Sequence, residues 1–306
     1  MRRLARVPIL TISPLPRSLI HFCSLSFTAR TCAVALAFLQ RKLIMHPMLN
    51  TAIKAARRAA TVINRAAFDV DRIAITEKQH NDFVTDVDQA AEQAIVETLL
   101  KAYPGHAILA EESGASANLN DDSEFAWIID PIDGTTNFMH GYPNYCVSIA
   151  LQQRGIITQA VIYDPVRNDL YTASKGAGAF LNEKRIRVTK HDRLTNTLLA
   201  SGHGAGPRAL DEYMRMYQLT SERCQAVRNG GSAALDLANV AAGRLDGFYE
   251  KGLKPWDIAA GSLLVTEAGG ICGEFSGESA YLNKGDIIAA SPKVFGQMVT
   301  LLAAFA

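Results

Sequence analysis

The chain lacks the features that mark secreted, membrane-bound or nucleic-acid-binding proteins. Its 306 residues carry a formal net charge of +1, which gives no broad basic surface for nucleic acid or a membrane. The five cysteines are odd in number and none forms a C-x-x-C pair, so neither a disulfide framework nor a zinc site is indicated. The seven histidines show no H-E-x-x-H motif or other paired spacing typical of metal ligands. We therefore expect a cytoplasmic protein with free thiols and no membrane partner.

The first 44 residues lack acidic side chains and differ from the rest of the chain. They are rich in Arg, Ser and Thr, a composition typical of organellar transit peptides, whereas their apolar run is short for a secretory signal. Arg30 interrupts that run, so too few apolar residues remain for a transmembrane helix, which needs roughly 20. Translation from Met45 or Met48 is the alternative. We expect residues 1–44 to be a disordered, cleaved or mis-assigned extension.

The remaining chain predicts layered α and β structure. Apolar residues at helical spacing predict helices at Leu49 to Ala67, Asp86 to Ala102, Leu210 to Arg223, Ser232 to Ala242 and Asp257 to Ala268. Short apolar runs predict strands at Ala107 to Ala110, Phe125 to Ile129, Tyr145 to Gln152, Ile156 to Tyr163, Leu170 to Ala173, Ala179 to Leu181, Gly247 to Glu250 and Asp286 to Ala290. The strands from Tyr145 to Leu181 are joined by turns alone, which indicates an antiparallel meander. We expect one domain over residues 45–306, with two closely packed halves of about 45–190 and 191–306.

Two carboxylates, Asp130 and Asp133, follow the apolar run that ends at Ile129. Pro131 fixes its own φ and bends the chain out of the strand, so both carboxylates and the Ile132 carbonyl can face one side of the turn. Oxygen ligands of this kind suit a hard cation such as Mg²⁺. Taken alone, however, the D-x-x-D-G spacing is more typical of a plain turn that the aspartates cap.

A possible anion site follows directly. Gly134 allows close backbone approach, and Thr135, Thr136 and Asn137 have the character of a first helical turn. The start of a helix presents N–H groups without intrahelical partners, together with the positive end of the helix dipole, and so attracts phosphate. The sequence therefore places candidate metal ligands next to a candidate phosphate site.

The segment from Asp130 to Phe138 resembles the signature of the inositol monophosphatase family. Three further segments resemble elements of that family in the same order: Asn81 to Asp88 is similar to D-x-V-T-x-x-D, Glu111-Glu112-Ser113 to G-E-E-S with Ala110 in place of Gly, and Trp256 to Gly261 to W-D-x-A-A-G. The resemblance covers roughly Met48 to Pro292 and is greatest to the bacterial SuhB-type members. It implies an α+β fold of the sugar-phosphatase type, a layered α/β/α/β/α sandwich with mixed and antiparallel sheets.

The resemblance also implies a role for each matched residue. The metal ligands would be Glu111, Asp130, the carbonyl of Ile132, Asp133 and Asp257, with Asp88 as a more remote acid. Catalysis would involve Glu111, Thr135 and Asp88. The substrate would contact Asp133, Gly134, Thr135, Thr136, Arg228, Ala233, Glu250 and Asp257. So many acids in one pocket would repel one another, and we expect about two or three Mg²⁺ ions to neutralise them.

The function that this resemblance implies is hydrolysis of myo-inositol-1-phosphate, or a similar polyol or sugar monoester, by water and without a covalent intermediate. The alternatives are other phosphate esters, namely fructose bisphosphate, a 3′-phosphoadenosine nucleotide or histidinol phosphate. A different alternative is a binding partner of the transcription antitermination machinery, associated with RNA polymerase or Nus factors. Inhibition by Li⁺ and a homodimer are further implications of the resemblance.

One glycine-rich run stands outside these motifs. Gly202 to Gly206 is followed by no Lys-Ser/Thr and lies in no βαβ context. It therefore predicts a flexible loop and not a nucleotide-binding loop.

Overall fold

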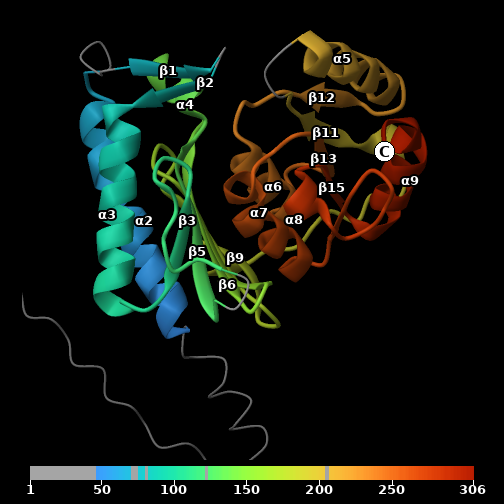
Figure 1. The fold of residues 1–306 in the computed structure, drawn as a ribbon. Coiled ribbons are helices and arrows are strands. Elements are labelled where there is room, and N and C mark those ends of the chain that lie inside the picture. Colours follow the sequence, from blue (N-terminus) through green and yellow to red (C-terminus); the bar gives the residue numbers. More distant parts are fainter. Residues whose placement is uncertain (1–45, 70–74, 80–81, 121–122, 204–206) are drawn as a thin grey trace, which may run out of the picture. The chain divides into compact units, whose positions relative to one another are not determined.

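The structure, a computed structural model, describes residues 46–69, 75–79, 82–120, 123–203 and 207–306 (Figure 1). The extension predicted for residues 1–44 lies outside the described residues. Residues His46–Ala306 form one unit by their internal contacts. Among the described residues, no helix has the length and apolar character to cross a membrane. The cysteines in this part of the chain, Cys146, Cys224 and Cys272, are free thiols.

Two long helices, α2 (Pro47–Ala66) and α3 (Asp86–Ala102), pack against each other. Proline is favoured at the start of a helix, and α2 begins with Pro47. The stripe that α2 buries is largely alanine, which allows close approach to its neighbours. Thr85 and Asp88 form a capping box that fixes the start of α3. Both helices agree with the predicted ranges to within two residues.

An eight-stranded sheet lies beside α2 and α3, and its strands follow the order β10-β9-β8-β7-β6-β5-β3-β4. The strands are β3 (Ala107–Ala110), β4 (Gly114–Ala115), β5 (Phe125–Asp133), β6 (Cys146–Gln153), β7 (Ile156–Asp164), β8 (Asp169–Ser174), β9 (Gly178–Leu181) and β10 (Lys184–Arg185). All neighbours pair antiparallel except β3 and β5, which are parallel. The predicted meander is therefore confirmed.

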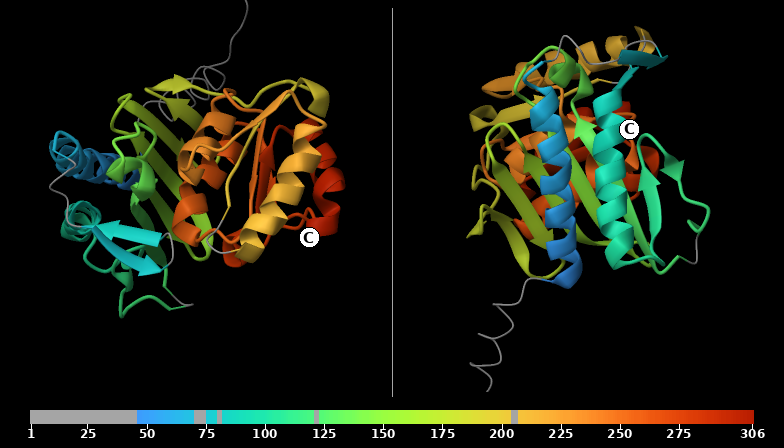
Figure 2. Two further views of the ribbon diagram at one scale, coloured as in Figure 1. Left: turned by 90° about the horizontal axis from the view of Figure 1, so that it is seen from above. Right: turned by 90° about the vertical axis from the view of Figure 1, so that its left-hand side faces the viewer.

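Alternate residues of β5 belong to two separate hydrophobic cores. Trp127 and Ile129 pack with α2 and α3, whereas Ile128 packs with α6 (Ala233–Ala241) and α7 (Pro255–Glu267). Successive side chains of a strand point to opposite faces, so this alternation means that helices cover both faces of the sheet. Figure 2 shows α2 and α3 lying across one face.

A second, mixed sheet of five strands has the order β12-β11-β13-β15-β14. Its strands are β11 (Leu198–Ser201), β12 (Ala226–Arg228), β13 (Gly247–Glu250), β14 (Ile271–Gly273) and β15 (Ile287–Ala290). Helices α6 and α7 lie between the two sheets, and α5 (Pro207–Ser221) and α9 (Pro292–Leu302) lie on the far side (Figure 1). The smaller elements are β1 (Ile75–Gln79), β2 (Asp82–Thr85), α4 (Thr135–Met139), η3 (Leu194–Asn196), α8 (Tyr281–Lys284) and η4 (Ala303–Phe305). The expected α/β/α/β/α layering with mixed and antiparallel sheets is confirmed.

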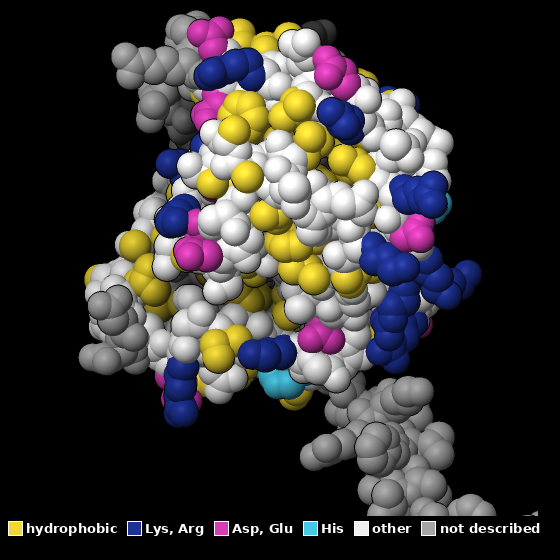
Figure 3. Space-filling model, turned by 90° about the vertical axis from the view of Figure 1, so that its right-hand side faces the viewer, with side chains coloured by type: hydrophobic (Ala, Val, Ile, Leu, Met, Phe, Trp, Pro, Cys, Tyr) yellow, Lys and Arg dark blue, Asp and Glu magenta, His cyan; other side chains and the backbone are white. Residues whose placement is uncertain are grey.

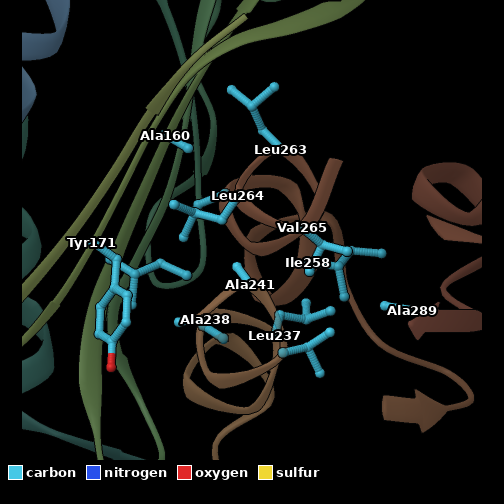
Figure 4. Packing of buried hydrophobic residues seen from close by; sticks show 14 of the residues in the cluster. Ala160, Tyr171, Leu237, Ala238, Ala241, Ile258, Leu263, Leu264, Val265 and Ala289 are labelled. Atoms are coloured by element: carbon cyan, nitrogen blue, oxygen red, sulfur yellow. The ribbon is translucent and has the colours of Figure 1, made fainter. Parts of the chain in front are cut away.

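Helices α6 and α7 are buried on all sides because each contacts both sheets. Figure 4 shows Leu237 and Ala238 of α6 packed beside Ile258 and Leu264 of α7, with Tyr171 of the meander close by. A helix that is apolar around its whole circumference belongs in the interior, which agrees with this position.

The structure differs from the predicted elements at the end of β5. The predicted strand stops at Ile129, whereas β5 continues to Asp133. The pairing of β5 with β6 is irregular between Asp130 and Asp133, where Pro131 has no N–H to donate. A bulge therefore accommodates the proline without ending the strand, and it turns the two aspartates toward the end of the sheet.

Candidate active site

The backbone after β5 is shaped by Gly134, which has a φ of 99° and precedes the short helix α4. A Cβ at this position would lie 3.0 Å from the Asn144 carbonyl oxygen and 3.1 Å from that of Gly231. Only glycine combines this φ with such close neighbours. Asn137 Nδ2 donates to the carbonyl oxygens of Asn144 (2.7 Å) and Gly230 (2.9 Å) and so ties α4 to the segment before α6.

A cleft of about 390 Å³ opens at this point. Most of the residues predicted for the site line it: Glu111, Asp130, Ile132, Asp133, Gly134, Thr135, Thr136, Ala233, Glu250 and Asp257. The cleft thus collects residues from β5, β13 and the starts of α4, α6 and α7. Its lining also contains residues that the sequence analysis did not assign to the site: Gly202, His203, Asn229, Gly231, Ser232, Asp236 and Leu253.

Two predicted residues lie outside the cleft lining. Asp88 is fully buried on α3, and its Oδ1 accepts a hydrogen bond from Thr135 Oγ1 (3.1 Å). The same threonine hydroxyl lies 3.0 Å from the Ile132 carbonyl oxygen. Asp88 is therefore placed to orient Thr135. Arg228 is exposed on β12, where its Nη1 donates to the carbonyl of Val227 (3.3 Å).

The carboxylates of the cleft raise one another's pKa values. Asp130 is only 2% exposed, and its pKa is raised well above the usual value, first by burial and then by the charges of Glu111, Asp133 and Asp257. Burial, followed by the charge of Asp133, likewise raises the pKa of Asp257. Burial also raises the pKa of Asp133. The group is therefore unfavourable in its ionised form unless positive charge is supplied.

This donor set fits a hard divalent cation. Carboxylate and carbonyl oxygens are the ligands that Mg²⁺ prefers, and Asp130 Oδ1 is a buried oxygen that has no hydrogen-bond partner among the residues described. In the described residues, however, no group of three or more His, Cys, Asp or Glu side chains is arranged to hold a metal ion. Asp133 Oδ2 instead accepts from Ser232 Oγ (2.5 Å) and the Ala234 amide (2.7 Å). The chemistry of the donors fits magnesium, but their arrangement is not that of a completed metal site.

Ser232 and Glu92 support the site, and sequence reasoning missed both. Ser232 is the N-cap of α6, a position that a serine directly before a run of helical residues could have indicated. Glu92 lies one helical turn after Asp88 on α3 and is 4% exposed. Its Oε2 accepts from the Glu112 amide (2.8 Å) and its Oε1 from the Ser113 amide (2.9 Å). Glu92 therefore fixes the backbone that follows Glu111, although no sequence signal distinguished it from a surface helix acid.

The glycine-rich run begins at the wall of the cleft. Gly202 and His203 line it, and the His203 ring packs against the Tyr213 ring with 5.1 Å between centroids. The described part of the predicted loop, Gly202 and His203, therefore lies at the site. Residues 204–206 lie outside the described residues.

Comparison with known proteins agrees with this fold. The model of the inositol monophosphatase family matches residues 44–304, and this chain belongs to that family, whose fold is that of a phosphatase. The resemblance to SuhB-type members is also confirmed. The chain is 48% identical over 261 residues to the putative Nus factor SuhB of Neisseria meningitidis serogroup B, covering 85% of this chain and 99% of the relative. It is 47% identical over 260 residues to the Nus factor SuhB of Escherichia coli K12, covering 83% and 95%.

Solved structures give the same result. The extragenic suppressor protein suhB of Bartonella henselae superposes with a TM-score of 0.81 at 38% identity, covering 84% of this chain and 98% of that one. The inositol monophosphatase of Thermotoga maritima superposes with a TM-score of 0.76 at 33% identity, covering 84% and 96%.

Proposed function

We propose that this protein is a magnesium-dependent phosphatase that hydrolyses the monophosphate of a polyol or sugar, such as myo-inositol-1-phosphate. The observation that carries the proposal is the buried Asp130 carboxylate, which shares a cleft with Glu111, Asp133 and Asp257. Its Oδ1 has no hydrogen-bond partner in the described part of the chain. Membership of the inositol monophosphatase family and the solved inositol monophosphatase from Thermotoga maritima support it.

The residues that would hold the cation are Glu111, Asp130, the Ile132 carbonyl, Asp133 and Asp257. Magnesium, when bound, supplies positive charge to the phosphate oxygens and lowers the pKa of water. Asp88 holds the Thr135 hydroxyl at the cleft, and Glu111 would accept a proton from the attacking water. The amides of Gly134 and Thr135 would bind the phosphate, with Thr136 beside them. Ala233 and Glu250 line the part of the cleft left for the alcohol.

A panel of phosphate esters tests the proposal. The panel contains myo-inositol-1-phosphate, fructose 1,6-bisphosphate, 3′-phosphoadenosine 5′-phosphate and histidinol phosphate, each assayed for phosphate release with Mg²⁺, with EDTA and with added Li⁺. We expect turnover of the inositol ester that EDTA abolishes and Li⁺ reduces. Equal turnover with and without magnesium, or turnover of the other esters alone, would contradict it.

The contacts of Glu92 give a prediction about positioning. Glu92→Ala leaves the partly buried Glu112 and Ser113 amides without their acceptor, and an unpaired amide costs up to about 1–3 kcal/mol when fully buried. We expect kcat/KM to fall about 10- to 100-fold and the magnesium concentration for half-maximal rate to rise, because Glu111 loses its fixed backbone. Glu92→Gln keeps an acceptor oxygen and should restore part of the rate.

The matched control is Glu97→Ala on the same helix. Glu97 forms an exposed ion pair with Arg58 (2.7 Å), and pairs of this kind contribute about 0–1 kcal/mol. Its kinetics should match those of the wild type. A Glu92→Ala protein with an unchanged magnesium requirement would rule out the positioning role.

A second candidate function is a Nus-type role in transcription antitermination, because several relatives bear the name Nus factor SuhB. The outer face of α5 offers a surface for a protein partner: Leu210 and Met214, one turn apart, remain 43% and 53% exposed. Figure 3 shows the side of the molecule that lies on the right in Figure 1. Hydrophobic side chains gather over the middle of this side, with Lys and Arg side chains along one edge.

Co-purification separates the two functions. Under the second function, a catalytically inactive Asp130→Asn protein should still retain RNA polymerase or Nus factors, and Met214→Asp should release them. If neither wild type nor Asp130→Asn retains these proteins while wild type releases phosphate strongly, the result would favour the phosphatase function alone. Size measurement of the same preparations would test the proposed homodimer.

A further inference from the structure

Two acids lie in the cleft beyond the proposed metal ligands. Asp236 occupies the first turn of α6, and Glu250 ends β13. Both line the cleft together with Ser232, Ala233 and Leu253. They come from different elements of the second half of the chain, so it is the folded structure, and not a sequence motif, that brings them to one site.

Both side chains are buried, but neither has a partner among the described residues. Asp236 is 7% exposed and Glu250 is 8% exposed. Neither carboxylate accepts a hydrogen bond from, or forms an ion pair with, any residue in the part of the chain that the structure describes. Buried carboxylates are nearly always paired or hydrogen-bonded, because desolvation otherwise costs several kcal/mol. Donors for these oxygens must therefore come from a bound molecule or from water in the cleft.

Two glycines leave room for these carboxylates. A Cβ at Gly202 would lie 2.3 Å from Glu250 Oε2 and 2.7 Å from Oε1. A Cβ at Gly230 would lie 3.2 Å from Asp236 Oδ1 and 3.5 Å from Oδ2. Both acids thus pack directly against backbone, and a larger residue at Gly202 would displace the Glu250 side chain.

The two acids also affect each other's protonation. Burial, followed by the charge of Asp133, raises the pKa of Asp236 to about 8. Burial, followed by the charge of Asp236, raises the pKa of Glu250 well above its usual range. A carboxyl group offers acceptor oxygens and, when protonated, an O–H donor as well, which is the combination that alcohol groups match.

We propose that Asp236 is a further substrate-binding residue, which together with Glu250 selects a leaving group that carries at least two hydroxyl groups and no second phosphate. This inference rests on the proposed phosphatase function. A second phosphate at this end of the cleft would meet two buried acids, and the cleft-lining residues that the structure describes include no Lys or Arg, so bisphosphates such as fructose 1,6-bisphosphate are disfavoured. A polyol instead satisfies the carboxyl groups of both residues.

The test compares Asp236→Ala and Asp236→Asn on two esters, myo-inositol-1-phosphate and 4-nitrophenyl phosphate, which has no alcohol hydroxyl. Asp236→Ala should lower kcat/KM for the inositol ester about 10- to 100-fold, mainly through KM, because a hydrogen bond to a buried polar group is lost. The loss in kcat/KM on 4-nitrophenyl phosphate should be smaller than this by at least about tenfold. Asp236→Asn resembles the protonated acid and should restore most of the rate on the inositol ester.

Stability provides a second measurement. Asp236→Asn removes a buried acid that has no partner, so its Tm should rise, whereas removal of a structural acid lowers Tm. Asp211→Ala on the exposed surface of α5 is the control and should behave like wild type on both esters.

Several outcomes would overturn the inference. Equal loss on the two esters would make Asp236 a structural residue, and no loss on either would remove it from the substrate site. Faster turnover of a bisphosphate or of an amino-substituted ester than of the inositol ester would contradict selection of a neutral polyol. Absence of turnover by the wild type on every ester would instead refute the proposed phosphatase function, and the inference would fall with it.

Discussion

Replacement of Asp130 by Asn should reduce phosphate release by about a thousandfold or more, since removal of a group that stabilises charge in a transition state costs about 10²–10³ or more in rate. The same replacement should make the metal-free protein more stable. The rate falls because the amide removes a charged cation ligand. The stability rises because one of the mutually repelling buried acids becomes neutral. Stopped-time phosphate assays give the rate, and thermal unfolding in EDTA gives the change in Tm. Magnesium should raise the Tm of wild type and have much less effect on the variant.

Asp164→Asn is the matched control. Asp164 is as buried as Asp130, at 2% exposed, but it is the last residue of β7 and accepts from Arg167 Nη1 (2.7 Å) and the Val166 amide (2.9 Å). Its replacement should lower Tm and leave the rate per folded molecule unchanged. If both variants shifted Tm in the same direction, the repulsion argument for Asp130 would be wrong.

Replacement of Gly261 by Ala should destabilise the protein by about 3 kcal/mol, the upper end of typical overpacking costs. A Cβ at Gly261 would lie 2.5 Å from both Cβ and Cδ1 of Leu237, so α6 and α7 would have to separate. The starts of these helices carry Ser232 and Asp257, so the rate should fall too. Urea unfolding measures the free energy, and the phosphate assay measures the rate.

The same substitution elsewhere gives the control. A Cβ at Gly296, inside α9, would meet nothing within 4 Å. Alanine is the better helix former by about 1 kcal/mol, so Gly296→Ala should increase the free energy of unfolding. Equal effects of the two substitutions would show that the close approach of α6 and α7 is not what requires Gly261.

The sequence predicted the long helices well because their apolar faces repeat over several turns. Helix α3 is an example. The meander strands from β6 to β9 were predicted for another reason, because they are short apolar runs with turns at their ends. Two elements that were missed, β11 and β12, are too short to show a period. Helix α9 was also missed, although Val294, Phe295, Met298 and Leu302 repeat at helical spacing. A four-residue apolar run fits a strand or a helix equally well.

The site was predicted only as far as its motifs extended. Asp130, Gly134 and Asp257 belong to segments with recognisable spacing, and they line the same cleft. Asp236 and Glu92 belong to no such segment, and each resembles an ordinary helix acid in the sequence. Their importance depends on burial and on which backbone or cleft they face, and these properties arise only when distant parts of the chain meet.

The bond from Ser232 to Asp133 has a consequence for folding kinetics. It joins residues 99 positions apart, and the bonds from Asn137 to the segment before α6 span a similar separation. Closing so long a loop costs entropy before any contact can form, so pairings of this kind arise late on average. During refolding from urea, far-UV circular dichroism should therefore recover before the enzymatic rate does. The cleft, not the sheets, would then be the last part of the molecule to reach its native form.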